Sequence, residues 1–299
     1  THEVIVLDDQ SIDATSEVVT AATRVDSRFR LIEGKDLPNG WLGKTWASHQ
    51  LAQAAKGTVV VFLDADVVLS PEAIARSVQT QRETGLDAIS PYPQQVSKTW
   101  LERVVQPLLQ WSWVTTLPLL IAERSPRGSL TAANGQFLVF DAQRYHSSGG
   151  FAAVKSHVLD DINIFRAIKA NGGRGVVIDG TDLAHCRMYD SNSALVSGYA
   201  KSLWSAFGGL GGTVFVNALL LTAYVAPFIF LLVPSTRLVG LAGVLSGITG
   251  RLLVAARTRA RLLPDCLLHP LSILIFAWLN AVSWTRHIKG TTQWKGRTV

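Results

Sequence analysis

Two carboxylates stand at the end of an apolar run in this chain. Residues 59–69 read VVVFLDADVVL, so Asp64 and Asp66 interrupt a segment that is otherwise typical of a buried strand. An ionised aspartate is costly to remove from water unless a cation or hydrogen-bond donors meet it. The pair therefore predicts a site for a divalent metal that carries a phosphate-rich ligand, although a solvated turn would also place two carboxylates there.

Strands and helices alternate over the first 90 residues or so. The hydrophobic pattern predicts strands at residues 4–7, 29–33 and 58–63, and helices at 13–23, 45–55 and from Pro71 to about residue 84. This alternation predicts an α/β fold with a mostly parallel, doubly wound sheet, in which ligands bind beyond the carboxyl ends of the strands. Four aspartates lie at such ends, namely Asp8, Asp9, Asp64 and Asp66.

The composition points to a membrane rather than to nucleic acid. Of the 299 residues 48% are hydrophobic, more than a soluble enzyme needs, and the formal net charge is +6. That charge suits nucleic acid, anionic lipid headgroups or a diphosphate, but no motif that reads nucleic acid is present. The two cysteines, Cys186 and Cys266, have no His or Cys at metal spacing, so neither a zinc site nor a disulfide framework is supported. A reducing cytoplasm fits.

Beyond about residue 203 the chain becomes strongly apolar. Residues 214–233 carry no charge and are long enough to cross the hydrocarbon core, and residues 238–254 and 266–284 are weaker candidates. We therefore expect a catalytic domain at residues 1–202 and a membrane region with two or three transmembrane helices at residues 203–299. Residues 100–123, rich in tryptophan but interrupted by prolines, suggest an interfacial helix, a lid or an ordinary core helix.

Basic residues set the expected orientation in an inner cell membrane. By the positive-inside rule, the loop at residues 257–261 and the C-terminal tail both favour the cytoplasm. Three full crossings cannot place both there, so either one segment is re-entrant or interfacial, or the tail breaks the rule. The residues concerned are Arg257, Arg259 and Arg261 in the loop and Arg286, Lys289, Lys295 and Arg297 in the tail.

Four motifs in order resemble the family 2 glycosyltransferases of the GT-A fold. They are DDQSIDAT at residues 8–15, WLGK at 41–44, DAD at 64–66 and LDD at 159–161. The stretch at residues 134–189, followed by GYAK at 198–201, resembles the membrane-bound branch that includes carotenoid (chlorobactene-type) glucosyltransferases. This resemblance covers nearly the whole chain. It implies a Rossmann-like nucleotide-diphospho-sugar transferase domain whose usual first strand, with a Pro-x-x-Asn-Glu-like segment, we expect to be missing here.

The resemblance assigns the donor side of the site. Asp66 would ligate Mg²⁺ or Mn²⁺, and Asp64 would face the ribose or a metal-bound water. Asp9, with Asp8 beside it, would hydrogen-bond the uracil or ribose, although a turn with a helix cap at Ser11 or Asp13 is the plainer interpretation. Both roles can hold at once.

Four further polar residues are expected to contact the donor. Lys44 could meet a phosphate or remain solvated, and Asn134 could touch sugar hydroxyls or form a turn. Arg187 and Lys201 could contact the diphosphate or anchor the domain on anionic headgroups.

The pair Asp160 and Asp161 opens a segment with helical periodicity. In the family, the second acid of this pair deprotonates the acceptor hydroxyl, which gives single displacement with inversion at the anomeric carbon. Two adjacent carboxylates raise one another's proton affinity, which suits a base. The alternative is an acidic helix start that complements the helix dipole.

Together these features predict an inverting, metal-dependent glycosyltransferase that uses a nucleotide sugar, UDP-glucose by resemblance, and a lipid acceptor such as a hydroxylated carotenoid or isoprenoid. Processive synthases of the superfamily carry Gln-x-x-Arg-Trp where this chain has KSLW at residues 201–204, so we expect one sugar per acceptor. The alternatives are a polyprenyl-phosphate glycosyltransferase and a non-catalytic membrane protein that binds nucleotide sugars.

Overall fold

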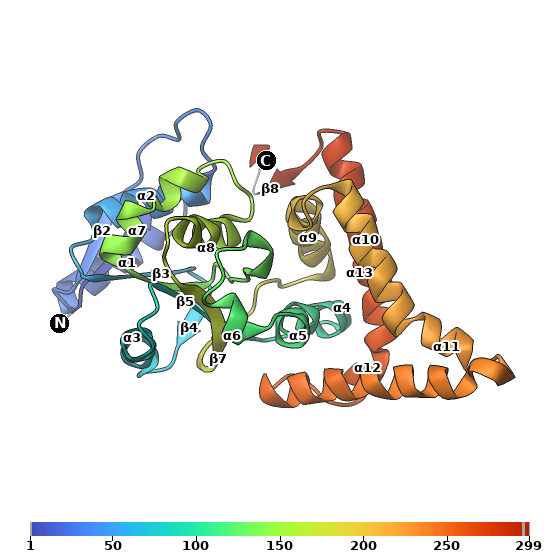
Figure 1. Cartoon of the computed structure of the whole chain (residues 1–299). Helices are drawn as coiled ribbons and strands as arrows, with labels where there is room; N and C mark the ends of the chain where they lie inside the picture. The colour runs from blue at the N-terminus through green and yellow to red at the C-terminus, as the bar shows by residue number, and fades with distance from the viewer. Residues whose placement is uncertain (1, 295–296, 299) are drawn as a thin grey trace. The chain divides into compact units, whose positions relative to one another are not determined.

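The computed structural model describes residues 2–294 and 297–298, so Lys295 of the basic tail lies outside the described residues. Figure 1 shows helices and strands mixed along the chain. The chain divides into two compact units, each described by itself below. The first comprises Thr1–Asp64, Ile74–Pro91 and Leu119–Ile178, and the second comprises Ala65–Ala73, Tyr92–Pro118 and Asp179–Val299. The domain boundary predicted at residues 202 and 203 stays a prediction.

The α/β class predicted from the hydrophobic pattern is confirmed. The N-terminal elements are β1 (Val4–Asp8), α1 (Thr15–Val25), β2 (Phe29–Glu33), α2 (Gly43–Ala54), β3 (Val59–Leu63), β4 (Val67–Leu69), α3 (Ala73–Thr84) and β5 (Ala88–Gln95). After residues 100–130 they continue with β6 (Phe137–Asp141), α7 (Ala142–Ser147), α8 (Asp160–Ala170) and β7 (Gly175–Cys186). Helix α1 begins two residues later than predicted, since Asp13 accepts a hydrogen bond from the Thr15 N–H at 3.0 Å. The predicted helix cap at Ser11 or Asp13 was wrong, since the N-cap of α1 is Ala14 and no side chain caps the helix.

The prediction of a mostly parallel sheet was wrong. Strands β1 and β2 pair in parallel as a two-stranded sheet, but β6 lies between β3 and β5 and is antiparallel to both. Strands β3 and β5 therefore run in the same direction without being neighbours. In the second unit, β4 pairs antiparallel with the end of β7. The βαβ pattern of the first 90 residues could not show this, because β6 arises more than forty residues after β5 ends.

Aromatic rings form the centre of the first unit. Phe62 on β3 packs edge-on against Phe140 on β6 and against Phe151, with ring centroids 5.9 and 4.9 Å apart. Tyr145 on α7 and Phe165 on α8 complete this buried group. Because β3 and α8 share this core, the residues at the end of β3 and at the start of α8 are held on rigid elements.

The tryptophan-rich stretch forms three short helices rather than one. They are α4 (Trp100–Val105), α5 (Pro107–Thr116) and α6 (Leu119–Ala122), and Pro107 and Pro118 mark the two breaks. Trp111 and Trp113 are buried while Trp100 is exposed. Trp111 packs with residues of α12 and α13 inside the second unit, as the core-helix alternative expects. An interfacial position for these helices stays a prediction.

Three helical segments of the second unit are long and apolar enough to cross a membrane: Leu210–Phe230, Pro234–Arg257 and Asp265–Ile288. They contain α10 (Leu210–Tyr224), α11 (Ala226–Phe230), α12 (Arg237–Arg257) and α13 (His269–Ile288), and they follow α9 (Asn192–Ala206). Short strands β8 (Gln293–Trp294) and β9 (Arg297–Thr298) are the last elements of the described residues. Figure 1 shows α12 running across the direction of α10 and α13 rather than along it.

Helices α10 and α13 lie side by side in opposite directions. Trp284 Nε1 donates to Thr213 Oγ1 at one end, and the rings of Tyr224 and His269 lie 4.9 Å apart at the other. The basic loop after α12 is fastened to β7 within the same unit, since Arg257 pairs with Asp179 at 2.7 Å. The loop therefore lies on the same side of any membrane as the sheet strand that it contacts.

Candidate active site

The pairing of β3 with β6 positions the first carboxylate of the DAD motif. The register aligns Leu63 with Phe137, and the next residue along β3, Asp64, donates its N–H to the Gln136 carbonyl at 3.1 Å. Asp64 therefore lies beside the segment 134–136 that leads into β6. Asp64 and Asn134 were both predicted to be site residues, and the structure places Asp64 beside the segment that contains Asn134.

Lys44 reaches the same place from the first turn of α2. Its Nζ lies 2.8 Å from Asp64 Oδ1 and 3.4 Å from the Gly135 carbonyl oxygen. The start of α2 is fixed because Thr45 Oγ1 donates to the Lys155 carbonyl at 2.7 Å. The Lys44 side chain remains 44% exposed, so it can also meet a ligand from solution.

The peptide group of Gly135 joins this ion pair to Asp161. The Gly135 N–H donates to Asp161 Oδ2 at 2.8 Å, while its carbonyl faces Lys44. A Cβ at this position would lie 3.0 Å from Lys44 Nζ and 3.4 Å from Asp161 Cβ, so a side chain would crowd both. Asp161 Oδ1 accepts a second hydrogen bond from the Ile162 N–H at 2.8 Å.

The surroundings of Asp161 favour its protonated form. Burial together with the neighbouring charge of Asp160 raises the pKa of Asp161 to about 6, although Lys44 and the two backbone hydrogen bonds act in the opposite direction. Burial alone would lower the pKa of Lys44, but the charges of Asp160, Asp64 and Asp161 raise it above its ordinary value. Lys44 is therefore a permanent cation among three carboxylates, and Asp161 is a carboxylate that can exchange a proton near neutral pH.

The remaining predicted residues of the first unit lie in turns. Asp8 Oδ1 accepts from the Ser11 N–H at 2.9 Å, which is the turn that the plainer interpretation expects. Asp9 is exposed. Asn134 is buried, and its side-chain oxygen accepts from the Gln136 N–H at 2.8 Å, so it shapes the turn that presents Gly135. Donor contacts of these three residues stay predictions.

Asp66, Arg187 and Lys201 belong to the second unit. Asp66 is exposed in the turn between β3 and β4, and burial together with the charge of Asp66 raises the pKa of Tyr189. Arg187 pairs with the buried Glu102 at 3.3 Å and also donates to the Asp190 carbonyl. Lys201 is half-buried on α9. The contact between Glu102 and Arg187 was not predicted, because the two residues lie 85 positions apart.

The carboxylates suit a hard divalent cation only in part. Among the described residues, no three His, Cys, Asp or Glu side chains come together as a metal-binding group. The Asp64 carboxylate forms an ion pair with Lys44, whereas Asp66 is exposed. Mg²⁺ and Mn²⁺ commonly use one or two protein carboxylates and complete their shell with waters and substrate phosphates, so this donor set fits such an ion arriving with a diphosphate.

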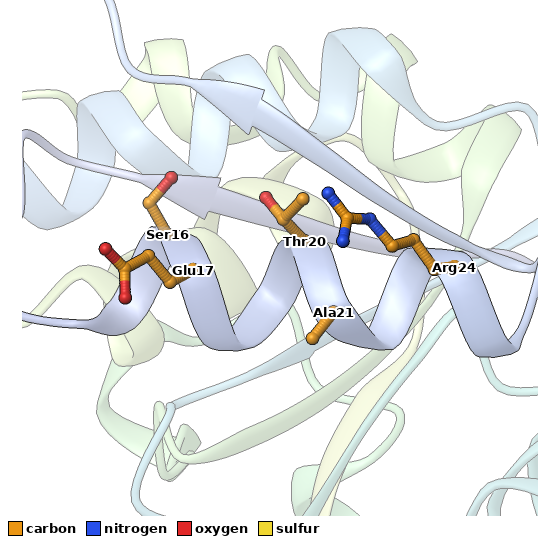
Figure 2. A pocket seen from close by; sticks show the side chains of 5 residues that line it. All are labelled: Ser16, Glu17, Thr20, Ala21 and Arg24. Carbon is orange, nitrogen blue, oxygen red and sulfur yellow. The ribbon is translucent and has the colours of Figure 1, made fainter.

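A hollow of about 330 Å³ on the surface of α1 does not involve these residues. Figure 2 shows the side chains that line it along α1, namely Ser16, Glu17, Thr20, Ala21 and Arg24. None of the predicted site residues lines it.

Comparisons with known proteins bear on the family and the fold. Residues 1–141 match the family described as Glycosyl transferase family 2. A solved structure, the mannosyltransferase PcManGT from Pyrobaculum calidifontis in complex with GDP-Man and Mn²⁺, superposes with a TM-score of 0.56 at 15% identity, over 96% of this chain and 77% of that one. At this identity the likeness shows the fold, which confirms the predicted GT-A class.

Two curated relatives are named as transferases. The 4,4'-diaponeurosporenoate glycosyltransferase of Staphylococcus haemolyticus is 25% identical over 212 residues, 67% of this chain and 53% of the relative. The undecaprenyl-phosphate 4-deoxy-4-formamido-L-arabinose transferase of Aeromonas hydrophila subsp. hydrophila is 30% identical over 115 residues, 37% of this chain and 33% of the relative. The matched parts therefore span about half and about a third of these relatives.

Proposed function

We propose that this chain, whose residues 1–141 match the family described as Glycosyl transferase family 2 and whose fold is of the GT-A class, is an inverting glycosyltransferase that transfers one sugar from a nucleotide sugar to a lipid. The observation that carries the proposal is the group in the first unit where the Gly135 peptide joins Asp161 to the Lys44–Asp64 pair. A protein that only binds nucleotide sugars would not need a carboxylate with a raised pKa beside its binding site.

Asp161 acts as the base in this proposal. Its carboxylate takes the proton of the acceptor hydroxyl as the hydroxyl oxygen forms a bond to the anomeric carbon. The bond from that carbon to the diphosphate oxygen breaks in the same step, and the nucleoside diphosphate leaves. The hydrogen bonds from Gly135 and Ile162 hold the carboxylate in one orientation, so the single displacement proceeds with inversion.

The donor is held by cations and turn residues. Lys44 neutralises part of the charge that develops on the leaving diphosphate, and Asp8 and Asp9 hold the base or ribose. Asp66, assisted by Asp64, would hold Mg²⁺ or Mn²⁺, which supplies Lewis-acid stabilisation of the leaving group. Arg187, Lys201 and Asn134 extend the donor contacts, and Asp160 supports the base by its charge. UDP-glucose is the donor we propose.

The acceptor is a lipid at the cytoplasmic face of the inner membrane. Three helices with the length and composition of membrane spans support a membrane position, and both curated relatives are named for isoprenoid lipids. The +6 net charge suits the anionic headgroups of that leaflet. We propose a hydroxylated carotenoid or another isoprenoid alcohol as the acceptor, and a single sugar as the addition.

The Aeromonas relative favours a second candidate, transfer to a polyprenyl phosphate. A phosphate oxygen is already ionised near pH 7, so such a transfer needs no base at Asp161. The two candidates therefore differ in how strongly activity depends on this carboxylate.

The pH dependence of turnover tests the base directly. Because Asp161 must be deprotonated to accept a proton, and its pKa is raised to about 6, kcat/KM for an alcohol acceptor is expected to be constant above that pH. Below it, kcat/KM should fall by about tenfold per pH unit, since only the ionised fraction reacts. Measurement of kcat/KM for the acceptor between pH 4.5 and 8, at saturating donor, tests for this fall. An unchanged kcat/KM down to pH 4.5 contradicts the assignment of Asp161 as the base.

Transfer into lipid tests the function itself. Membranes containing the protein are incubated with labelled UDP-glucose and Mg²⁺ or Mn²⁺, and label is counted in the organic extract. We expect label that EDTA abolishes and that membranes lacking the protein do not show. If the extract stays unlabelled with native lipids present and a panel of other nucleotide sugars also fails, the proposed activity is wrong.

A further inference from the structure

One arginine inside a candidate membrane helix is buried in the second unit. Arg251 on α12 is 2% exposed, whereas Arg237 and Arg257 at the ends of the same helix are exposed. Arg251 Nη2 donates to the Val104 carbonyl at 3.4 Å, and Nη1 has no hydrogen-bond partner among the described atoms. A buried guanidinium with an unused donor is costly unless a counter-charge meets it.

Two acidic side chains that are buried in the second unit are paired with other arginines. Asp265 accepts two hydrogen bonds from Arg103, with Nε at 2.9 Å from Oδ2 and Nη2 on Oδ1. Glu102 pairs with Arg187. Within the described part of the chain, no ion pair links Arg251 to a carboxylate. The three arginines Arg103, Arg187 and Arg251 therefore carry one positive charge more than Asp265 and Glu102 neutralise.

Two further polar side chains of the second unit are buried and have unused hydrogen-bonding atoms, and Gln106 lies two residues after Val104, whose carbonyl accepts from Arg251. Gln106 is 0% exposed, and neither its amide nitrogen nor its oxygen has a partner among the described atoms. The hydroxyl of Tyr199, 4% exposed, also lacks one, and the ring lies in the same hydrophobic cluster as Val104, whose carbonyl contacts Arg251. Burial raises the pKa of Tyr199 while the charge of Arg251 opposes that rise, so the hydroxyl lies near the guanidinium.

Guanidinium, phenol and amide groups are all hydrogen-bond donors, and together with a net positive charge they match the oxygens of a phosphate. We propose that Arg251, Tyr199 and Gln106 bind the phosphate of an anionic phospholipid between α12 and the α4–α5 junction. This site is separate from the transferase reaction and does not rest on it.

A bilayer lipid is favoured over a free anion by the position of Arg251. It lies on α12 six residues before Arg257, within the segment Pro234–Arg257 that has the length and composition of a membrane span. The outer face of α12 offers apolar side chains to acyl chains, with Leu253 68% exposed and Leu245 also exposed. Basic sites between membrane helices recognise anionic headgroups in this way.

Thermal unfolding of the full chain in a neutral detergent tests the proposal. Three additions are compared: phosphatidylglycerol, diacylglycerol with the same acyl chains, and inorganic phosphate. We expect only phosphatidylglycerol to raise the Tm. In Arg251→Gln the half-saturating lipid concentration should rise by about tenfold or more, as expected for loss of a charge-assisted hydrogen bond. Arg237→Gln, an exposed arginine of the same helix, should behave like the wild type.

Each contrary result overturns a defined part of the proposal. An equal lipid response in Arg251→Gln and wild type removes Arg251 from the site, and a response to inorganic phosphate alone replaces the lipid by a free anion. If Arg251→Gln does not fold, Tyr199→Phe and Gln106→Leu take its place, because each removes polar atoms that the protein itself leaves unpaired. Both should fold and bind phosphatidylglycerol more weakly, and unchanged binding in both overturns the proposal.

Discussion

Replacing Asp161 by asparagine is expected to lower transfer to an alcohol acceptor by about 10²–10⁴-fold, the usual contribution of a positioned general base. The asparagine oxygen can still accept the Gly135 N–H, so the geometry around Lys44 and Asp64 should persist. Donor binding should therefore be nearly unchanged. Single-turnover transfer and calorimetric titration with the nucleotide sugar, made on the same preparation, measure the two quantities separately.

The matched control for this variant is Glu83→Gln, which neutralises an exposed carboxylate on α3 of the same unit. It should retain wild-type transfer. Wild-type turnover in Asp161→Asn would refute the base assignment. If that turnover were seen with a polyprenyl phosphate and not with an alcohol, the second candidate acceptor would replace the first. Loss of donor binding in the variant would instead make Asp161 a donor-site residue.

Replacing Asp66 by asparagine is expected to remove the response to metal. Loss of one preorganised electrostatic contact to a leaving group costs about 10²–10³-fold in turnover. Because Asp66 is exposed and no described residue pairs with it in an ion pair, the change should leave the free energy of unfolding nearly unaltered. Electron paramagnetic resonance of Mn²⁺ titrated into protein with UDP measures the binding step independently of catalysis.

Glu72→Gln serves as the control for this second variant. Glu72 is an exposed carboxylate six residues farther along the same segment of the second unit, so its removal changes the net charge equally. Mn²⁺ binding should be retained in that variant and weakened at least tenfold in Asp66→Asn, by the loss of a carboxylate ligand. Equal Mn²⁺ binding in both variants would show that the metal is held elsewhere.

Sequence patterns predicted the elements better than their arrangement. The strand at Phe29–Glu33 has the predicted limits, and the three apolar segments after residue 203 coincide with the long helices to within several residues. The spacing of apolar residues reflects which side chains of a helix or strand are buried, and this spacing can be read from the sequence itself. The position of β6 between β3 and β5 depends instead on contacts between distant segments, and no local pattern contains that information.

The residues of the candidate site likewise differ in how well the sequence predicted them. The position of Asp64 at the end of an apolar run singled it out, because a carboxylate there is costly to desolvate, whereas the family resemblance singled out Asp161. Lys44 was equally compatible with a phosphate contact and with a solvated surface, and only its distance to Asp64 shows that it is held in the site. The pairing of Arg187 with Glu102 was not predicted, since it joins residues 85 positions apart.

The link between Lys44 and Asp161 is made by main-chain atoms of Gly135. Alanine substitutions of polar side chains would leave the N–H and the carbonyl of Gly135 in place. They would therefore not reveal this link. Chemical editing of the main chain reaches it: an ester in place of the amide between Asn134 and Gly135 deletes the N–H donor to Asp161 and adds no bulk. Semisynthesis thus removes this hydrogen bond alone, whereas a side chain introduced at Gly135 would also crowd Lys44 and Asp161.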